Sequence, residues 1–154
     1  MNAIVSPPEL TGQAPEAVPS VFEKVGNLLG TKIRSEQDAF RLVLSGVKPR
    51  SYRLFIKHLK APPSLIGSES TLRRRLKENA ELSEVESERV IRLSRVFVLA
   101  VELFGDEKSA LEWLNTPGEW LAGAGPITPM ALASKEAGAR MVEASIQRTL
   151  HGIF

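Results

Sequence analysis

Residues 83–104 have the sequence SEVESERVIRLSRVFVLAVELF, and this segment gives the strongest indication of the fold class. Its apolar side chains recur every three or four positions, the spacing that places them on one face of an α-helix. Ser83 and Glu86 match a capping box, in which each side chain satisfies a free backbone amide at the helix start. Gly105 ends the helix. The sequence therefore predicts one long central helix. Its expected apolar face comprises Val90, Leu93, Phe97, Ala100, Val101 and Phe104.

Shorter helices are expected on both sides of the central helix, because glycine, proline and capping residues delimit further periodic segments. No alternation of apolar and polar residues longer than four positions indicates a strand, and no internal repeat is evident. The expected fold class is therefore mainly α. The upstream helices are expected over residues 21–29, 36–45, 49–60, about 64–66 and 70–79, and the downstream helices over 107–114, a short segment from Pro129, and 135–151.

Two of these helices carry expectations about individual residues. Ser35 can cap the helix over 36–45, and Gly46 ends it. In the final helix, Ser134 is the expected N-cap. Gly138 lies inside that helix, where glycine costs about 1 kcal/mol relative to alanine, which predicts a close approach of another backbone. The inward stripe of the 36–45 helix is expected to comprise Ala39, Phe40, Val43 and Leu44.

The composition suits one ordinary domain or two small ones. The chain has 154 residues, of which 43% are hydrophobic and 25% charged, enough for a buried core under a polar surface. It contains no cysteine, which excludes disulfides, thiolate metal sites and a cysteine nucleophile. No apolar run approaches the ~20 residues that span a bilayer, and no signal peptide is evident, so a cytoplasmic protein is expected. Residues 1–19 hold four prolines and are expected to form a flexible arm.

Charge is distributed unevenly along the chain. The net charge is +2, yet residues 41–77 contain ten lysines and arginines and a single acid, Glu69, a local charge of +9. Residues 78–112 contain nine acids and four bases. A basic block beside an acidic one is typical of a surface that faces a polyanion. The alternative is a solvated basic face without a partner.

The sequence offers no set of residues for catalysis. His58 and His151 are far apart along the chain, and neither has a second ligand type at metal-binding spacing. Gly123, Ala124 and Gly125 resemble part of a phosphate loop, but a third glycine and a preceding strand are missing, so a connecting loop is expected. No nucleophile–base pair is visible. We therefore expect a protein that is not an enzyme and that has no metal site and no cofactor.

Residues 64–79 have the layout of a helix-turn-helix. A short apolar helix is followed by a turn at Gly67 and a polar helix, in which Leu72 and Leu76 are spaced to anchor the helix to the body. The first residues of such a helix reach base edges when it lies in the major groove. A solubilising arginine-rich face is the alternative. The expected DNA-contacting residues are Ser68, Ser70, Thr71, Arg73, Arg74, Arg75 and Lys77.

The last 45 residues contain a spaced series of small, apolar and aromatic residues. Trp113 and Trp120 are interpreted as core anchors, since large aromatic side chains stabilise small helical domains by burial. Ile153 and Phe154 at the end are either a frayed tail or a plug that enters a partner's cleft. The series comprises Ala110, Leu111, Trp113, Leu114, Pro117, Leu121, Gly123, Pro126, Leu132, Gly138, Val142 and the terminal residues from His151 to Phe154.

This series resembles the toxin-binding region of bacterial antitoxins of the Xre/ParS/MbcA type. Upstream, residues 71–75 are similar to the start of the second helix of their helix-turn-helix, and residues 82–83 and 88–96 to the helix that follows. The resemblance implies an Xre-like helix-turn-helix domain followed by a small helical toxin-binding domain. The implied division is an N-terminal arm over 1–19, a DNA-binding domain over 20–104 and a toxin-binding domain over 105–154.

The resemblance also implies a function. The protein would be the antitoxin of a type II toxin–antitoxin pair and would inhibit a RES-type or ParT-type toxin, a class that resembles ADP-ribosyltransferases and acts on NAD. A homodimer within a larger complex would bind operator DNA and repress its own operon. The alternative is a stand-alone transcriptional repressor whose C-terminal region only dimerises. The residues expected to cover the toxin's active site are Lys135, Arg140, Glu143, Arg148, Leu150, His151, Ile153 and Phe154.

Overall fold

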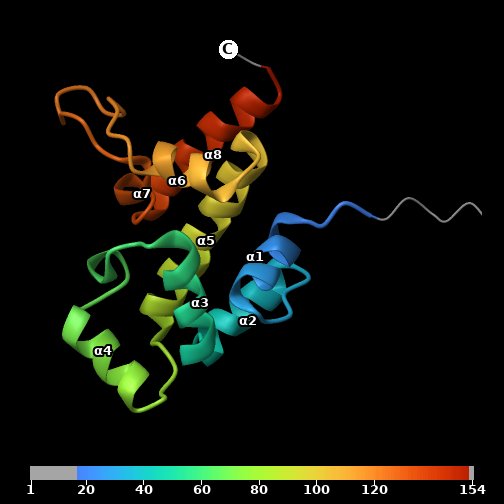
Figure 1. Ribbon diagram of the computed structural model, residues 1–154, viewed down its shortest axis with the longest axis vertical. Helices are drawn as coiled ribbons and strands as arrows, with labels where there is room; N and C mark the ends of the chain where they lie inside the picture. The colour runs from blue at the N-terminus through green and yellow to red at the C-terminus, as the bar shows by residue number, and fades with distance from the viewer. Residues whose placement is uncertain (1–16, 153–154) are drawn as a thin grey trace, which may run out of the picture.

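The computed structural model describes residues 17–152, and these residues form helices around one long central helix (Figure 1). Among them no strand forms, and one isolated antiparallel bridge joins Gly118 and Ile127. The expectation of a mainly α fold is confirmed. No helix in this part of the chain has the length and apolar character needed to cross a membrane. The elements are α1 (Val21–Leu29), α2 (Glu36–Ser45), α3 (Pro49–Leu59), the 3-10 turn η1 (Pro63–Leu65), α4 (Glu69–Lys77), α5 (Glu84–Phe104), α6 (Glu107–Leu114), α7 (Pro129–Leu132) and α8 (Glu136–Leu150).

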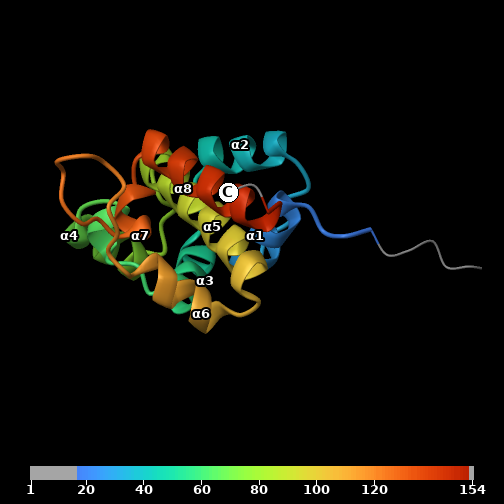
Figure 2. The same cartoon turned by 90° about the horizontal axis from the view of Figure 1, so that it is seen from above.

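The central helix α5 is covered by other helices on several sides (Figures 1 and 2). Helices α1, α2 and α3 pack against it from the upstream part of the chain, and α6 and α8 from the downstream part. The buried surface of α5 is therefore wider than the single apolar face that the sequence predicts. Val96, Val98 and Leu99 are buried as well, because neighbours surround the helix, whereas Phe104 at its end is partly exposed.

Most helix ends follow their local sequence signals. The Ser83 hydroxyl accepts a hydrogen bond from the N–H of Glu86, whose carboxylate accepts one from the N–H of Ser83 at 2.9 Å, so the predicted capping box is confirmed. Ser35 caps α2 by accepting the N–H of Asp38. Gly30 ends α1 with a left-handed backbone conformation.

Ser134 does not cap α8, and that expectation is wrong. Its hydroxyl donates to the carbonyl of Ala131 at 2.6 Å, and its own carbonyl accepts from Arg92 of α5. The N-cap of α8 is Lys135, without a side-chain capping bond. A serine hydroxyl can bond to any nearby backbone group, and here the group within reach is the end of α7.

The inward stripe expected for α2 is wrong for two of its four members. Ala39 is buried and Val43 is half-buried, but Phe40 and Leu44 are exposed. Helix α2 packs mainly on α5, so much of its surface stays uncovered. Phe40 and Leu44 therefore face water, whereas Leu42 packs against the core.

The close approach predicted at Gly138 is present. A Cβ added at this position would lie 1.9 Å from the carbonyl oxygen of Leu132, so α7 and α8 touch through their backbones. Val142 and Ile146 continue the same face of α8 and are buried. This face therefore packs inside the molecule.

Candidate functional site

The helix-turn-helix segment lies at one end of the molecule, where α4 is set apart from the other helices (Figure 1). Its first element is the single 3-10 turn η1, Gly67 lies in the turn, and α4 begins at Glu69. Leu72 is buried and Leu76 is partly buried against the core. The side of α4 that the sequence assigns to the protein body does face it.

The opposite side of α4 is basic and open to solvent, since Arg73, Arg74 and Lys77 are exposed there. Arg73 pairs with Glu69 one turn earlier at 3.2 Å. An exposed pair of this kind contributes little to stability, so it is easily exchanged for a phosphate contact. This side of α4 has the charge and accessibility that a nucleic-acid contact requires.

The start of α4 leaves backbone amides without a side-chain acceptor. Ser68 occupies the N-cap position but makes no capping hydrogen bond, and its hydroxyl lies 3.1 Å from that of Ser70. Both serines are exposed, and Thr71 is half-buried. Free amides at a helix N-terminus favour an anionic oxygen, as a DNA phosphate would supply.

Arg75 points toward α5 instead of outward. Its Nε lies 2.7 Å from Oε1 of Glu86, an ion pair that is mostly shielded from solvent. The sequence grouped Arg75 with its two neighbours because the three arginines are consecutive. The structure separates them, since one helical turn places only some of them on the outer side of α4.

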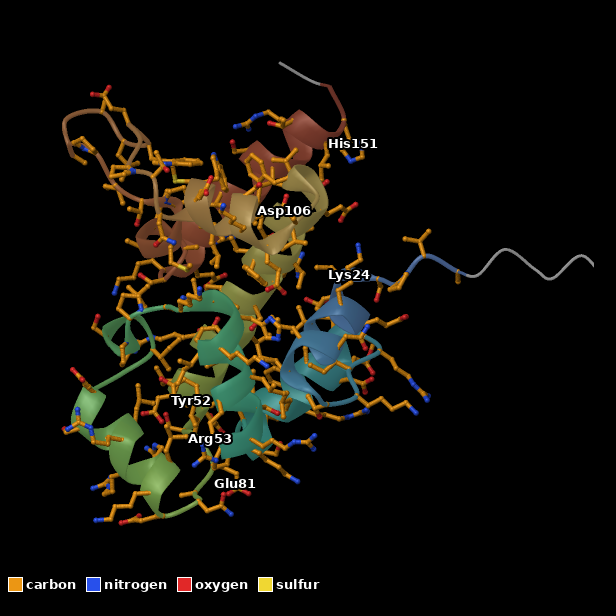
Figure 3. The ribbon with its side chains drawn as sticks, in the orientation of Figure 1. Lys24, Tyr52, Arg53, Glu81, Asp106 and His151 are labelled. Atoms are coloured by element: carbon orange, nitrogen blue, oxygen red, sulfur yellow. The ribbon has the colours of Figure 1, made fainter. Side chains whose placement is uncertain are left out.

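Arg53 of α3 is a residue that the sequence analysis missed. Its guanidinium donates to the carbonyl of Leu76 at 3.2 Å, and Figure 3 shows it in the first half of α3, near Glu81 in the segment that follows α4. Lys48 and Arg50, near the start of α3, are exposed. The charge pattern indicated this region as a whole, but the packing of α3 determines which arginine reaches α4.

The residues expected to contact a toxin lie on α8 and beyond it. Leu150 is partly buried against the core, whereas His151 stands at the free end of α8 (Figure 3). Ile153 and Phe154 lie outside the described residues. Four of the expected residues are exposed, namely Lys135, Arg140, Arg148 and His151.

Glu143 differs from the other expected contacts because it is engaged inside the protein. Its Oε1 lies 3.0 Å from Nε of Arg95 on α5. Burial raises the pKa of the Glu143 carboxyl above its usual value, and Arg95 opposes part of that rise. The Arg95 guanidinium also lies 5.3 Å from the ring centroid of Phe22. Glu143 thus links α8 to α5 and α1.

The loop between α6 and α7 projects from the same end of the molecule as the free end of α8 (Figure 1). Gly118 and Ile127 exchange two backbone hydrogen bonds, of 3.0 and 2.9 Å, which close its base. The ring of Trp113 lies 5.5 Å from that of Phe104 and 6.2 Å from that of Trp120. Both tryptophans pack against the core, in agreement with their interpretation as anchors.

The fold is an all-helical one in which the basic helix α4 lies at one end, and α6 and α8 pack on the central helix α5. Residues 99–152, from the second half of α5 to just past α8, match a family model described as the antitoxin Xre/MbcA/ParS C-terminal toxin-binding domain. This part of the chain is thus similar to the toxin-binding domain of Xre/MbcA/ParS antitoxins, and the expected resemblance is confirmed.

Curated relatives support the same family. The chain is similar to Antitoxin Xre of Yersinia enterocolitica, with 41% identity over 90 residues that cover 58% of each protein. It is 37% identical to Antitoxin Xre of Photorhabdus laumondii over 81 residues, 52% of this chain and 53% of the relative. Antitoxin Xre of Pseudomonas putida is 29% identical over 82 residues, 53% of this chain and 50% of the relative. The chain thus spans little more than half the length of the relatives that it matches.

Proposed function

We propose that this protein is the antitoxin of a toxin–antitoxin pair and that it holds a toxin protein inactive by binding it. The observation that carries the proposal is the match of residues 99–152 to a toxin-binding domain. Three relatives named Antitoxin Xre support it. Such an activity requires no chemistry from the chain, because a surface that excludes the toxin's substrate is sufficient.

The toxin is proposed to be of the RES or ParT type, acting on NAD, and the end of α8 with the tail after it is proposed to cover the toxin's active site. Gly138, Val142 and Ile146 occupy the inner face of α8, so contacts with a partner fall to its outer face and its free end. A few buried anchors ringed by charges would dominate the binding energy. The proposed contacts are Arg148, Leu150, His151, Ile153 and Phe154.

A second activity, repression of its own operon, is proposed for the basic side of α4. Arginines at the outer face of a helix can contact guanine edges and phosphates, and Arg75 would position the helix through Glu86. Two copies related by two-fold symmetry would bind an inverted repeat. The proposed DNA contacts are Ser68, Ser70, Thr71, Arg73, Arg74 and Lys77.

The experiment is capture of the full chain from its native host through an N-terminal tag, with the C-terminus left free. We expect one stoichiometric partner that consumes NAD after separation and is silent in the complex. Removing residues 148–154 should abolish neutralisation on co-expression. The matched control, Arg73→Ala with Arg74→Ala, should still neutralise. Recovery of no partner would refute the antitoxin proposal, and neutralisation by the truncated chain would refute the role of the tail.

A stand-alone repressor is the second candidate function. It is favoured by the packing of one face of α8 against the rest of the protein. The face of α8 around Gly138 is covered by Leu132 of α7, so it is not open to a partner. If the captured chain brings down only itself and DNA, the C-terminal unit is structural and the protein acts as a repressor alone.

A further inference from the structure

Helix α4 is attached to the rest of the protein by few apolar side chains. In the described part of the chain its closest packing partner is the short turn η1, whereas the longer helices pack closely on one another (Figure 1). Its inner side carries Leu72, which is 2% exposed, and the half-buried Leu76. These leucines are one turn apart on one side of the helix. Their burial therefore fixes which side of α4 faces the body, but it leaves the tilt of the helix weakly determined.

Arginine side chains supply further attachments of α4. Two of them, Arg75 and Arg89, join α4 and the residue before its turn to the start of α5. A third comes from α3, where Arg53 donates to the carbonyl of Leu76 at 3.2 Å. Leu76 lies in the last turn of α4, which ends at Lys77. Arg53 therefore holds the end of α4 that is farthest along the chain from η1.

A hydrogen bond from this guanidinium is suited to fix the end of α4. The last carbonyls of an α-helix carry the negative end of its dipole, so a cationic donor is favoured there. The Leu76 carbonyl also accepts the N–H of Asn79 at 3.3 Å, a long bond that leaves room for a second donor. On the other side, α3 is firmly packed, since Tyr52 and Phe55 beside Arg53 are fully buried. The backbone of Arg53 is therefore a fixed point from which its side chain reaches α4.

We propose that Arg53 is a positioning residue for DNA binding, which sets the tilt of α4 through the carbonyl of Leu76. The inference rests on the DNA-binding function proposed above for the outer side of this helix. Arg73 and Arg74 on that side meet DNA together when the helix axis has one particular orientation. A helix that tilts about its leucines has to be ordered as DNA binds, and this ordering lowers the affinity. Arg53 thus raises the operator affinity by acting through α4.

A direct contact between Arg53 and a phosphate is the competing role, because its side chain is exposed and cationic. The two roles differ in their response to salt. Removing a phosphate contact lowers the slope of log affinity against log salt by about 1. Loss of positioning lowers the affinity by the same factor at every salt concentration and leaves that slope unchanged.

The test measures promoter binding and amide hydrogen exchange in the full chain, with the DNA upstream of its own gene as the probe. For Arg53→Ala we expect the affinity to fall about fivefold or more, at an unchanged salt slope. The amides of α4 should exchange about threefold faster or more, while those of α5 stay unchanged. Arg53→Lys, which keeps a cationic donor, should restore most of the protection in α4. Arg50→Ala removes the same charge from an exposed position on α3 and should leave the exchange of α4 unchanged.

A salt slope lowered by about 1 with unchanged exchange of α4 would assign Arg53 to a phosphate contact and overturn the proposal. An unchanged affinity would overturn it too, as would faster exchange in α5 as well as α4, which indicates a general loss of stability. Equal effects of Arg50→Ala and Arg53→Ala on α4 would show that charge matters and the hydrogen bond does not.

Failure of the DNA-binding function itself has a different signature. If the unaltered chain does not bind its promoter, that function is refuted, and the role of Arg53 in DNA binding is refuted with it. The exchange measurement needs no DNA, so it still shows whether Arg53 holds the end of α4. A wrong assignment of Arg53 is thereby distinguished from a wrong assignment of the function.

Discussion

The Nε atom of Arg75 lies 2.7 Å from Oε1 of Glu86, and this ion pair joins the basic helix α4 to the start of the central helix α5. The Glu86 carboxylate also accepts the N–H of Ser83 in the capping box. Arg89, one turn further along α5, donates to the carbonyl of Ile66 at 2.9 Å, just before the turn at Gly67. The first turns of α5 therefore hold the whole helix-turn-helix in place.

Replacing Glu86 with glutamine should lower the free energy of unfolding by about 2–4 kcal/mol. The side chains of Arg75 and Glu86 are only 24% and 9% exposed, and removing one charge leaves the other shielded without its partner. Chemical denaturation measures the decrease. Glu84→Gln, at an exposed position in the same turn, is the control and should change stability by no more than about 0.5 kcal/mol. Equal decreases in both variants would contradict a specific role of the ion pair.

Replacing Arg73 and Arg74 with alanine should weaken operator binding at least tenfold and flatten its dependence on salt. Removing one phosphate contact reduces the slope of log affinity against log salt by about 1. Binding titrations over a range of salt concentrations measure both effects. Arg140→Ala with Arg148→Ala removes the same charge from exposed positions on α8 and should leave the slope unchanged. If the two pairs behave alike, α4 does not contact DNA specifically.

Tyr52 should make the protein less stable in alkali. Burial, and secondarily the charge of Glu86, raises the pKa of Tyr52 to about 12, whereas an unfolded tyrosine has a pKa of about 10. The folded state thus holds this proton more tightly than the unfolded state does. The contribution of Tyr52 to the free energy of unfolding is therefore fully present below pH ~10 and is lost as the pH rises toward about 12. Denaturation near neutral pH and between those two values measures the loss, which Tyr52→Phe should largely remove. An unchanged pH dependence in Tyr52→Phe would show that another group causes it.

The same tyrosine offers a direct reading of its surroundings, because the chain contains no other. The pKa of Tyr52 can be measured from the tyrosinate absorbance during an alkaline titration. The substitution Glu86→Gln should lower this pKa. The pKa should stay above the ordinary value, since burial is the larger cause. A return to the ordinary value would mean that the substitution opens the core around Tyr52.

Replacing Gly138 with alanine should destabilise the protein, although alanine is the better helix former by about 1 kcal/mol. The added methyl group would lie 1.9 Å from the carbonyl oxygen of Leu132, so α7 and α8 would have to separate, at a cost of about 1–3 kcal/mol or more. Thermal and chemical denaturation measure whether the substitution lowers or raises the free energy of unfolding. Ala137→Ser, at an exposed position on the same helix, should be nearly neutral. A more stable Gly138→Ala variant would show that helix propensity dominates and that the contact with α7 yields easily.

The tertiary structure changed the interpretation of several side chains, and each case has the same origin. Arg74 and Arg75 are adjacent residues of the same type, but Arg75 is the one that forms an ion pair with Glu86. Phe40 and Leu44 fit a helical stripe as well as Ala39 does, yet both are more than half exposed in the described part of the chain. A hydrophobic pattern shows which residues can share a face, whereas the neighbours present at that face decide whether it is buried.

The mainly α fold and most helix ends follow from the amino-acid sequence alone. The caps of α5 and α6, at Ser83 and Asp106, accept an N–H three residues later, so their signals are contained in a few consecutive residues. The partners of Arg53, Arg75 and Glu143 are set by the tertiary structure, because the packing of separate helices brings each partner close. Local hydrogen bonding is specified within one helical turn, but burial and pairing across helices depend on the arrangement of the whole chain.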